Sequence, residues 1–208
     1  MSATIYHDWD WQWTQDPRAL ERAYNLVQKA LALDDSHPTA HVILGRLLLE
    51  QGQFEAAAAE TDRGIALAPN DTGNYYCAAS GNVDWAADTL NRSGRPAQAL
   101  EITEKAIRQD PERSDFHLEE VGLAYYELGR PAEAISALQR FIEAYPVFPD
   151  ARYILTASYV ELGMMEKARA EAADIMRLSP HFSLEAGVFK AVDSQDRLLS
   201  DLRKAGLK

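Results

Sequence analysis

The sequence is poor in cysteine, in basic residues and in long apolar runs, and each shortage excludes a class of protein. Cys77, the single cysteine, cannot form an intramolecular disulfide or a zinc cluster of several cysteines. No run approaches the roughly 20 apolar residues that a membrane span requires. The 32 acidic residues outnumber the 21 basic ones, and the resulting formal charge of −11 repels the phosphates of nucleic acids. We therefore expect no membrane span and no nucleic-acid ligand. Because residues 1–15 carry no basic start followed by an apolar stretch, we expect a cytoplasmic protein.

The motifs that most often carry catalysis are also missing. The sequence contains no HExxH, no GxSxG and no GxxxxGK[ST]. The adjacent carboxylates Glu119 and Glu120 would point about 100° apart on a helix, which does not suit an acid–base pair. The five histidines are scattered along the chain at packing positions: His7, His37, His41, His117 and His181. We predict a protein without catalytic activity, cofactor or metal site.

What the sequence does have is a set of small residues and prolines that recurs in steps of 42, 35 and 34 residues. Four kinds of marker follow these steps. The turn glycines are Gly52, Gly94, Gly129 and Gly163; the alanines are Ala57, Ala99, Ala134 and Ala168; the prolines are Pro69, Pro111, Pro146 and Pro180; and the tight positions are Gly45, Ala87, Gly122 and Thr156. Between the markers, apolar residues recur at helical spacing, as at Leu44, Leu47 and Leu48.

Each marker has a mechanical reason. A glycine can adopt the left-handed conformation that ends a helix, and a proline cannot continue one. A small residue in mid-helix, such as Gly45, lets two backbones approach closely. An alanine such as Ala57 fits where two helices cross, and a larger residue there would overpack the crossing by roughly 1–3 kcal/mol. The markers thus predict four pairs of helices, each pair with a first helix A and a second helix B.

A helix–turn–helix unit of about 34 residues with these markers is identified as a tetratricopeptide repeat, and the resemblance extends throughout the chain. It implies an all-α, right-handed solenoid of antiparallel helix pairs that binds other proteins and has no catalytic role. The chain departs from the family at Ala87 and Thr156, which replace the tight glycine, and at His41, where the family usually has tryptophan. Packing at these three places is therefore expected to differ from that of the family.

The predicted organisation is one domain, 1–208. Its parts are an N-terminal stub and half-repeat (1–37), repeat one (38–71), an insertion (72–79), repeat two (80–113), repeat three (115–148), repeat four (149–182) and a C-terminal cap (183–208). Asp16 and Pro17 start a helix that extends to Leu33. The cap includes a helix from Gln195 to Ala205 with the apolar stripe Leu198, Leu199, Leu202 and Ala205, ended by Gly206. A solenoid needs such a helix to cover its last apolar face.

Two aromatic segments leave alternatives open. The alternating Trp9, Trp11 and Trp13 cover the exposed end of the first helix pair, or pack against a preceding domain. The insertion region, which brings Tyr75, Tyr76 and Trp85 close together in the sequence, is a binding loop or the product of neutral drift.

The two ends of the chain resemble something narrower than the repeat family. The stretches LSPHFSLE and DLRKAGLK, and the opening WTQDPRALERAYNLVQKALALD, are similar to the C-terminal repeat regions of bacterial class III nucleotide cyclases and winged-helix regulators. This resemblance implies a regulatory or scaffolding role in bacterial signalling.

In tetratricopeptide arrays the concave face of the A helices binds extended or helical peptides. The predicted partner-binding groove is drawn from the second, fifth, ninth, twelfth and thirteenth places of each repeat, with Trp85 added. Its residues are Arg46, Glu50, Asp84, Trp85, Asp88, Asn91, Arg92, Phe116, Glu119, Leu123, Tyr126, Glu127, Asp150, Tyr153 and Glu161. The set is acidic and aromatic, which suits a protein or peptide with basic and apolar anchors. The alternative is that these charges serve solubility alone.

The clamp that grips C-terminal carboxylates in some family members is expected to be absent. Its matching places hold Val42, Asp84, Glu119 and Tyr153, and only the neighbouring Arg46 has a suitable charge. We therefore predict that chaperone-type acidic C-terminal peptides do not bind. Two other roles stay open, a regulatory module of a larger signalling protein and a self-assembling scaffold, and a small-molecule pocket at the insertion ranks last.

Overall fold

The computed structural model describes residues 17–70, 85–180, 182–184 and 195–208, and every regular element in these ranges is a helix. The all-α class is therefore confirmed for this part of the chain. Several predictions lie outside the described residues: the N-terminal tryptophans, the insertion 72–79 with its two tyrosines, and the groove residue Asp84.

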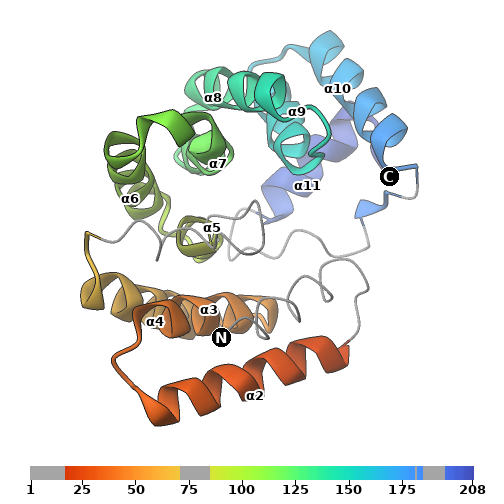
Figure 1. Ribbon diagram of the computed structural model, residues 1–208. Helices are drawn as coiled ribbons and strands as arrows, with labels where there is room; N and C mark the ends of the chain where they lie inside the picture. The colour runs from red at the N-terminus through yellow and green to blue at the C-terminus, as the bar shows by residue number, and fades with distance from the viewer. Residues whose placement is uncertain (1–16, 71–84, 181, 185–194) are drawn as a thin grey trace. The chain divides into compact units, whose positions relative to one another are not determined.

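The helices follow the predicted order of A and B helices (Figure 1). They are α2 (Pro17–Leu33), α3 (Pro38–Glu50), α4 (Phe54–Leu67), α5 (Trp85–Arg92), α6 (Pro96–Gln109), the 3-10 helix η2 (Pro111–His117), α7 (Leu118–Glu127), α8 (Pro131–Ala144), α9 (Asp150–Glu161), α10 (Met165–Leu178) and α11 (Gln195–Ala205). The A helices are α3, α5, α7 and α9, and the B helices are α4, α6, α8 and α10. The predicted bounds of α11 are confirmed at both ends.

The four marker prolines end the B helices in one common way. Each B helix stops two residues before its proline, and the residue between them is extended, with φ from −129° to −144° and ψ from 67° to 79°. Proline excludes the helical conformation from the residue that precedes it. The chain therefore leaves the helix at Ala68, Asp110, Tyr145 and Ser179 with nearly the same geometry, which keeps successive repeats alike.

The turn glycines end the A helices as predicted. Their φ angles lie between 69° and 75°, in the left-handed region. At the first turn the Gly52 N–H donates to the carbonyl of Leu49 and the Gln53 N–H donates to that of Leu48, both at 2.9 Å. The same two bonds recur at Gly129 and Gly163. This is the hydrogen-bond pattern of a Schellman motif, which satisfies the last carbonyls of the helix.

The tight positions differ in how closely they pack. A Cβ on Gly45 would lie 2.8 Å from the carbonyl oxygen of Ala57, and a Cβ on Gly122 would lie 2.6 Å from Leu138 Cδ2. Ala87 and Thr156 are fully buried, and the Thr156 hydroxyl donates to the Arg152 carbonyl at 2.7 Å. The two departures from glycine are thus accommodated by the packing around them.

Replacing Gly45 with alanine is expected to lower the free energy of unfolding by about 1–3 kcal/mol, because a backbone carbonyl must move to admit the new methyl group. Ala59→Gln on the exposed side of α4 should change it by less than about 0.5 kcal/mol. Urea unfolding of both variants measures the difference. Equal midpoints would show that α3 and α4 do not approach as closely as the structure has them.

His41 compensates for the missing tryptophan with hydrogen bonds. The ring is buried; its Nδ1 lies 2.6 Å from the Glu60 carboxylate on α4, and its Nε2 lies 2.8 Å from the Asp35 carbonyl. The side chain therefore ties α3 both to its partner helix and to the loop that precedes it.

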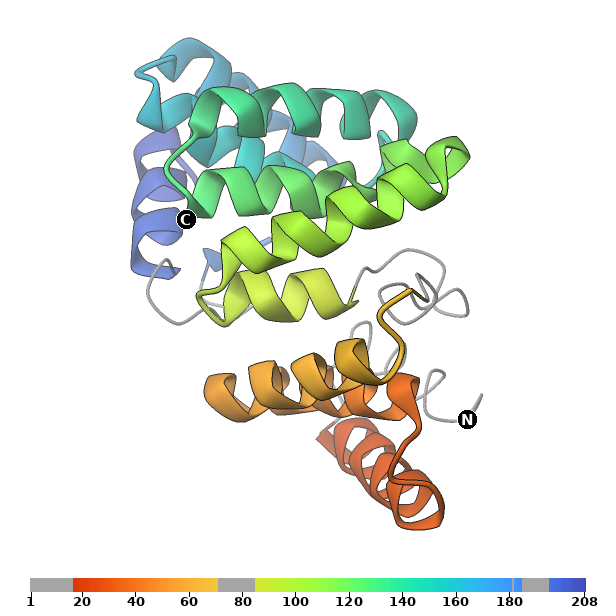
Figure 2. The ribbon, with the colours of Figure 1, turned by 90° about the vertical axis from the view of Figure 1, so that its left-hand side faces the viewer.

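The chain divides into two compact units, 1–93 and 94–208. In the first, α3 pairs with α4, α2 packs on α3, and α5 packs on both members of the pair. In the second, α7 pairs with α8, α9 pairs with α10, and α11 packs mainly on α9 (Figure 2). The predicted single domain 1–208 and its right-handed superhelix stay predictions.

Candidate functional site

In unit 1 the predicted groove residues form an ion-pair network. Arg46 Nη1 donates to one Asp88 oxygen at 2.7 Å, and Arg92 Nε lies 2.7 Å from the other. Arg46 also pairs with Glu50 at 2.9 Å. Arg46 and Asp88 are only 5% and 4% exposed, so their charges are committed to one another.

This network is neutral, because its two arginines balance its two carboxylates. Trp85 and Asn91 are also predicted groove residues, and both are buried. The described part of the unit 1 groove therefore offers neither the surplus negative charge nor the exposed aromatic surface that the sequence suggested.

In unit 2 several predicted groove residues on α7 and α9 contact helix α11. Tyr126 on α7 is fully buried, and the Arg197 guanidinium carbon of α11 lies 4.3 Å from the centre of its ring. Arg197 Nη2 also donates to the Tyr126 carbonyl at 2.8 Å. The Tyr126 hydroxyl donates to Asp201 of α11 at 3.3 Å, and burial raises the pKa of that hydroxyl. Tyr126 is thus an anchor for α11 through its ring, its carbonyl and its hydroxyl.

Two further groove residues pair with the same arginine. Glu127 and Glu161 lie 3.5 Å and 3.6 Å from Arg197. Desolvation raises the pKa of Glu161 although Arg197 lowers it, and the nearby Asp201 raises it further. The shift therefore follows mainly from the burial of Glu161 beside α11.

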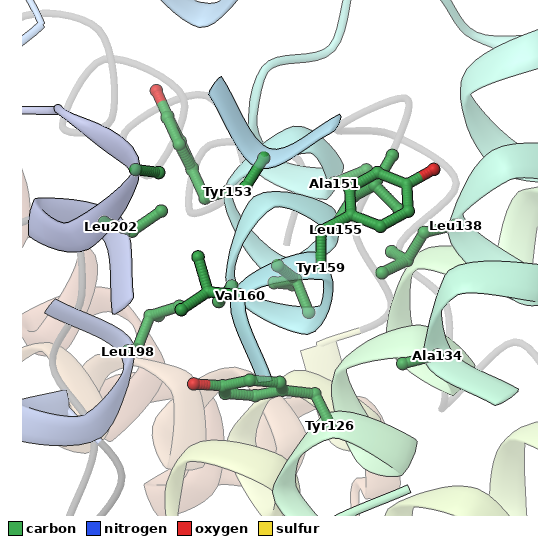
Figure 3. Packing of buried hydrophobic residues seen from close by; sticks show 14 of the residues in the cluster. Tyr126, Ala134, Leu138, Ala151, Tyr153, Leu155, Tyr159, Val160, Leu198 and Leu202 are labelled. Carbon is green, nitrogen blue, oxygen red and sulfur yellow. The ribbon is translucent and has the colours of Figure 1, made fainter. Parts of the chain in front are cut away.

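An apolar contact completes the docking of α11 (Figure 3). Leu198 and Leu202 are 6% and 0% exposed, and they belong to one buried cluster with Tyr153 and Val160 of α9. Figure 3 shows the two leucines of α11 beside these two residues, with Tyr126 at the lower edge of the cluster. We call the surface formed by Tyr126, Glu127, Tyr153, Val160 and Glu161 the α7–α9 face.

The remaining predicted groove residues lie beside this contact or pack elsewhere. Phe116 packs edge-to-face on Tyr145, with ring centres 5.8 Å apart. Glu119 and Leu123 are half-buried on α7, and Asp150 is exposed at the start of α9. The structure therefore brings four of the predicted residues together around α11: Tyr126, Glu127, Tyr153 and Glu161.

The sequence analysis missed the residues that fill this face. Arg197 and Asp201 contact it from α11, and Phe182 stacks on Tyr153 with ring centres 4.8 Å apart. The apolar stripe of α11 indicated that the helix packs, but it did not indicate on which surface. The basic residues of α11, among them Arg197 directly beside Leu198, were the available signal that the target is acidic.

Comparison with known proteins agrees with the repeat geometry. One model described as tetratricopeptide repeat matches residues 17–78 and 90–146, and a second with the same description matches residues 121–181. The chain belongs to the tetratricopeptide repeat family. The family predicted from the glycine, alanine and proline markers is thereby confirmed.

Solved structures of tetratricopeptide repeat proteins share the fold. PilW, a widely conserved type IV pilus biogenesis factor, is 16% identical with a TM-score of 0.63, over 98% of this chain and 88% of its own. TTC0263, a thermophilic TPR protein of Thermus thermophilus, is 24% identical with a TM-score of 0.61, over 89% and 91% of the two chains. YrrB, a TPR protein with an unusual peptide-binding site, is 23% identical with a TM-score of 0.51, over 86% and 90%. At these identities the likeness shows the fold alone.

A curated relative is far longer than this chain. Cellulose synthase operon protein C of Pseudomonas fluorescens (strain SBW25) is 25% identical over an alignment of 167 residues that covers 77% of this chain and 12% of the relative. This tetratricopeptide repeat chain thus matches only a small part of that protein.

Within the described ranges, no helix combines the length and the apolar character needed to cross a membrane. In the same ranges, no group of three or more His, Cys, Asp or Glu side chains is placed to hold a metal ion.

Proposed function

We propose that this tetratricopeptide repeat protein is a non-catalytic interaction module that binds a protein or peptide with basic and apolar anchors. The site is the α7–α9 face in unit 2, which α11 covers in the structure, so that a ligand would bind there in place of α11. The observation that carries the proposal is the way in which α11 is held, with an arginine on the acidic and tyrosine side chains and two leucines on the apolar ones. The groove residues predict a partner with the same chemistry as α11, namely a helix with a basic side chain and apolar side chains on one face.

The location of the charges distinguishes this face from the rest of the predicted groove. In unit 1 the acidic side chains are neutralised by Arg46 and Arg92. On the α7–α9 face, Glu127 and Glu161 lie on α7 and α9, and the basic group opposite them, Arg197 of α11, has a side chain that is 36% exposed, against 6% for Arg46. An external ligand can therefore supply the same charge.

The test is binding of a fluorescein-labelled amphipathic peptide with one arginine and two leucines on one stripe, measured by anisotropy against the full chain. Glu127→Lys with Glu161→Lys should weaken binding at least 10-fold, about 1.4 kcal/mol, because the arginine then meets like charge. Glu143→Lys with Glu166→Lys makes the same change in net charge on the exposed B helices α8 and α10, and should leave the affinity unchanged. Equal losses in both double variants, or no binding at all, would contradict the proposal.

A role as the regulatory module of a larger bacterial signalling protein, such as a nucleotide cyclase, is the second candidate. The similarity of the two ends of the chain to cyclase and winged-helix regulator regions favours it, and the same face would then bind another part of that protein. A self-assembling scaffold is the third candidate, and light scattering at several concentrations separates it from a monomeric peptide binder. In each case we propose a cytoplasmic protein.

A further inference from the structure

We propose that the α7–α9 face accepts a helix in one direction only, antiparallel to α7 and α9, with an arginine near the N-terminal end of the ligand. The arginine binds where the C-terminal ends of α7 and α9 meet. The inference rests on the proposed function, and it adds the direction of the ligand and the basic residue that sets this direction. Helix α11 shows the arrangement, because it occupies the face in the structure.

The direction of α11 follows from the order of its contacts along α9. Arg197, near the start of α11, lies 3.6 Å from Glu161, the last residue of α9. Leu202, further along α11, lies beside Tyr153, which is nearer the start of α9 (Figure 3). The contacts move forward along α11 and backward along α9, so the two helices are antiparallel.

The C-terminal ends of α7 and α9 together form the arginine site. α7 ends at Glu127 and α9 ends at Glu161, and Arg197 lies 3.5 Å from the first carboxylate and 3.6 Å from the second. Arg197 Nη2 also donates at 2.8 Å to the carbonyl of Tyr126, which is among the last carbonyls of α7. One guanidinium thus reaches both helix ends. Because the C-terminal end of a helix carries partial negative charge, two neighbouring ends favour a cation at this place.

The site suits a guanidinium better than an ammonium group. The Arg197 guanidinium carbon lies 4.3 Å from the centre of the Tyr126 ring, while Nη2 donates to the carbonyl of the same residue. A planar guanidinium can stack on a ring and still donate hydrogen bonds from its edge, whereas an ammonium is a compact, strongly hydrated point charge. Tyr126 is fully buried, so the packing around it holds the ring in place. We therefore expect arginine instead of lysine at this place in a ligand.

The other end of the face has a different chemistry. Near the start of α9, Phe182 stacks on Tyr153 with ring centres 4.8 Å apart, and Tyr153 belongs to the buried apolar cluster that includes Leu202. The carboxylate at this end, Asp150, is exposed to solvent, where an ion pair contributes little. It also lies in the first turn of α9, and the partial positive charge of a helix N-terminus disfavours a cation. A ligand in the opposite direction would therefore lose the arginine site.

The experiment measures the direction of a peptide bound to the full chain. The probe is an amphipathic peptide, blocked at both ends, with the order Arg-Leu-x-x-x-Leu that α11 has from Arg197 to Leu202. It carries a nitroxide on its first residue in one preparation and on its last residue in the other. Broadening of methyl signals is measured at Leu162, directly after α9, and at Ala151, near its start. The two methyl groups lie at opposite ends of a helix that is about 18 Å long.

The nitroxide on the first residue should broaden Leu162 more than Ala151, and the nitroxide on the last residue should do the reverse. With fluorescein in place of the nitroxide, the peptide that has lysine for arginine should bind at least about threefold more weakly, because it cannot stack on the ring in the same way. The opposite pattern of broadening, equal broadening of both methyl groups by each label, or equal affinity of the two peptides would overturn the inference and leave the proposed function in place. No binding, or broadening of neither methyl group, would overturn both.

Discussion

Asp88→Ala is expected to lower the free energy of unfolding by about 3–5 kcal/mol, because it leaves two arginines close together in a site with little access to water. Removing both members of the buried pair, as in Arg46→Met with Asp88→Met, should cost less than the single change. Urea unfolding followed by circular dichroism measures both.

An exposed ion pair serves as the control for this prediction. Glu104 and Arg108 on α6 are 3.6 Å apart with side chains 48% and 66% exposed, so Glu104→Ala should change stability by less than about 1 kcal/mol. If Asp88→Ala cost no more than Glu104→Ala, the network around Arg46 would not be buried as the structure has it. A charge reversal at Asp88 is therefore expected to lower the stability of the fold. A loss of binding in such a variant would not by itself show that Asp88 contacts a partner.

Leu202→Ala is expected to have the second large effect. The side chain is fully buried between α11 and α9, and Leu-to-Ala changes at such places cost about 2–5 kcal/mol. If α11 opens by itself, the loss appears as faster amide hydrogen exchange in α11, while α7 and α9 keep their protection. Leu199→Ala, at a half-buried place on the same helix, should have a smaller effect. Equal exchange in the two variants would contradict the docking of Leu202.

Local features were predictable from the sequence because they depend on single residues. Gly52 and its three equivalents require positive φ, and the prolines two residues beyond each B helix exclude helical backbone before them. The ends of α11 followed from its apolar stripe and from Gly206, which has φ of 105°. Each of these rules needs no knowledge of the neighbouring helices.

Features that depend on which surfaces meet were not predictable. Arg46 and Asp88 are 42 residues apart, and their pairing requires that α3 and α5 lie side by side. Gly64 carries no turn signal, yet a Cβ there would lie 2.8 Å from the Pro38 carbonyl. The place of α11 is the same kind of information, since an apolar stripe shows that a helix packs without showing where.

The predicted groove residues were chosen by their position in the repeat. This rule selected residues that lie against α11 and also residues that form ion pairs within the fold. It selected Tyr126, Glu127, Tyr153 and Glu161, which lie together against α11. It also selected Arg46 and Asp88, whose charges are used within the fold. The position of a residue in the repeat predicts which side of its helix the residue occupies. Which carboxylates could pair with a ligand depends on the ion pairs that they already form within the fold.

The most direct test of this account is a nuclear Overhauser measurement on the full chain with labelled methyl groups and tyrosine rings. The account predicts contacts from Leu202 to Tyr153 and from Leu198 to Val160 in the protein alone. Absence of both contacts, with α11 amides exchanging as freely as in an unfolded peptide, would contradict the docking of α11 on the α7–α9 face.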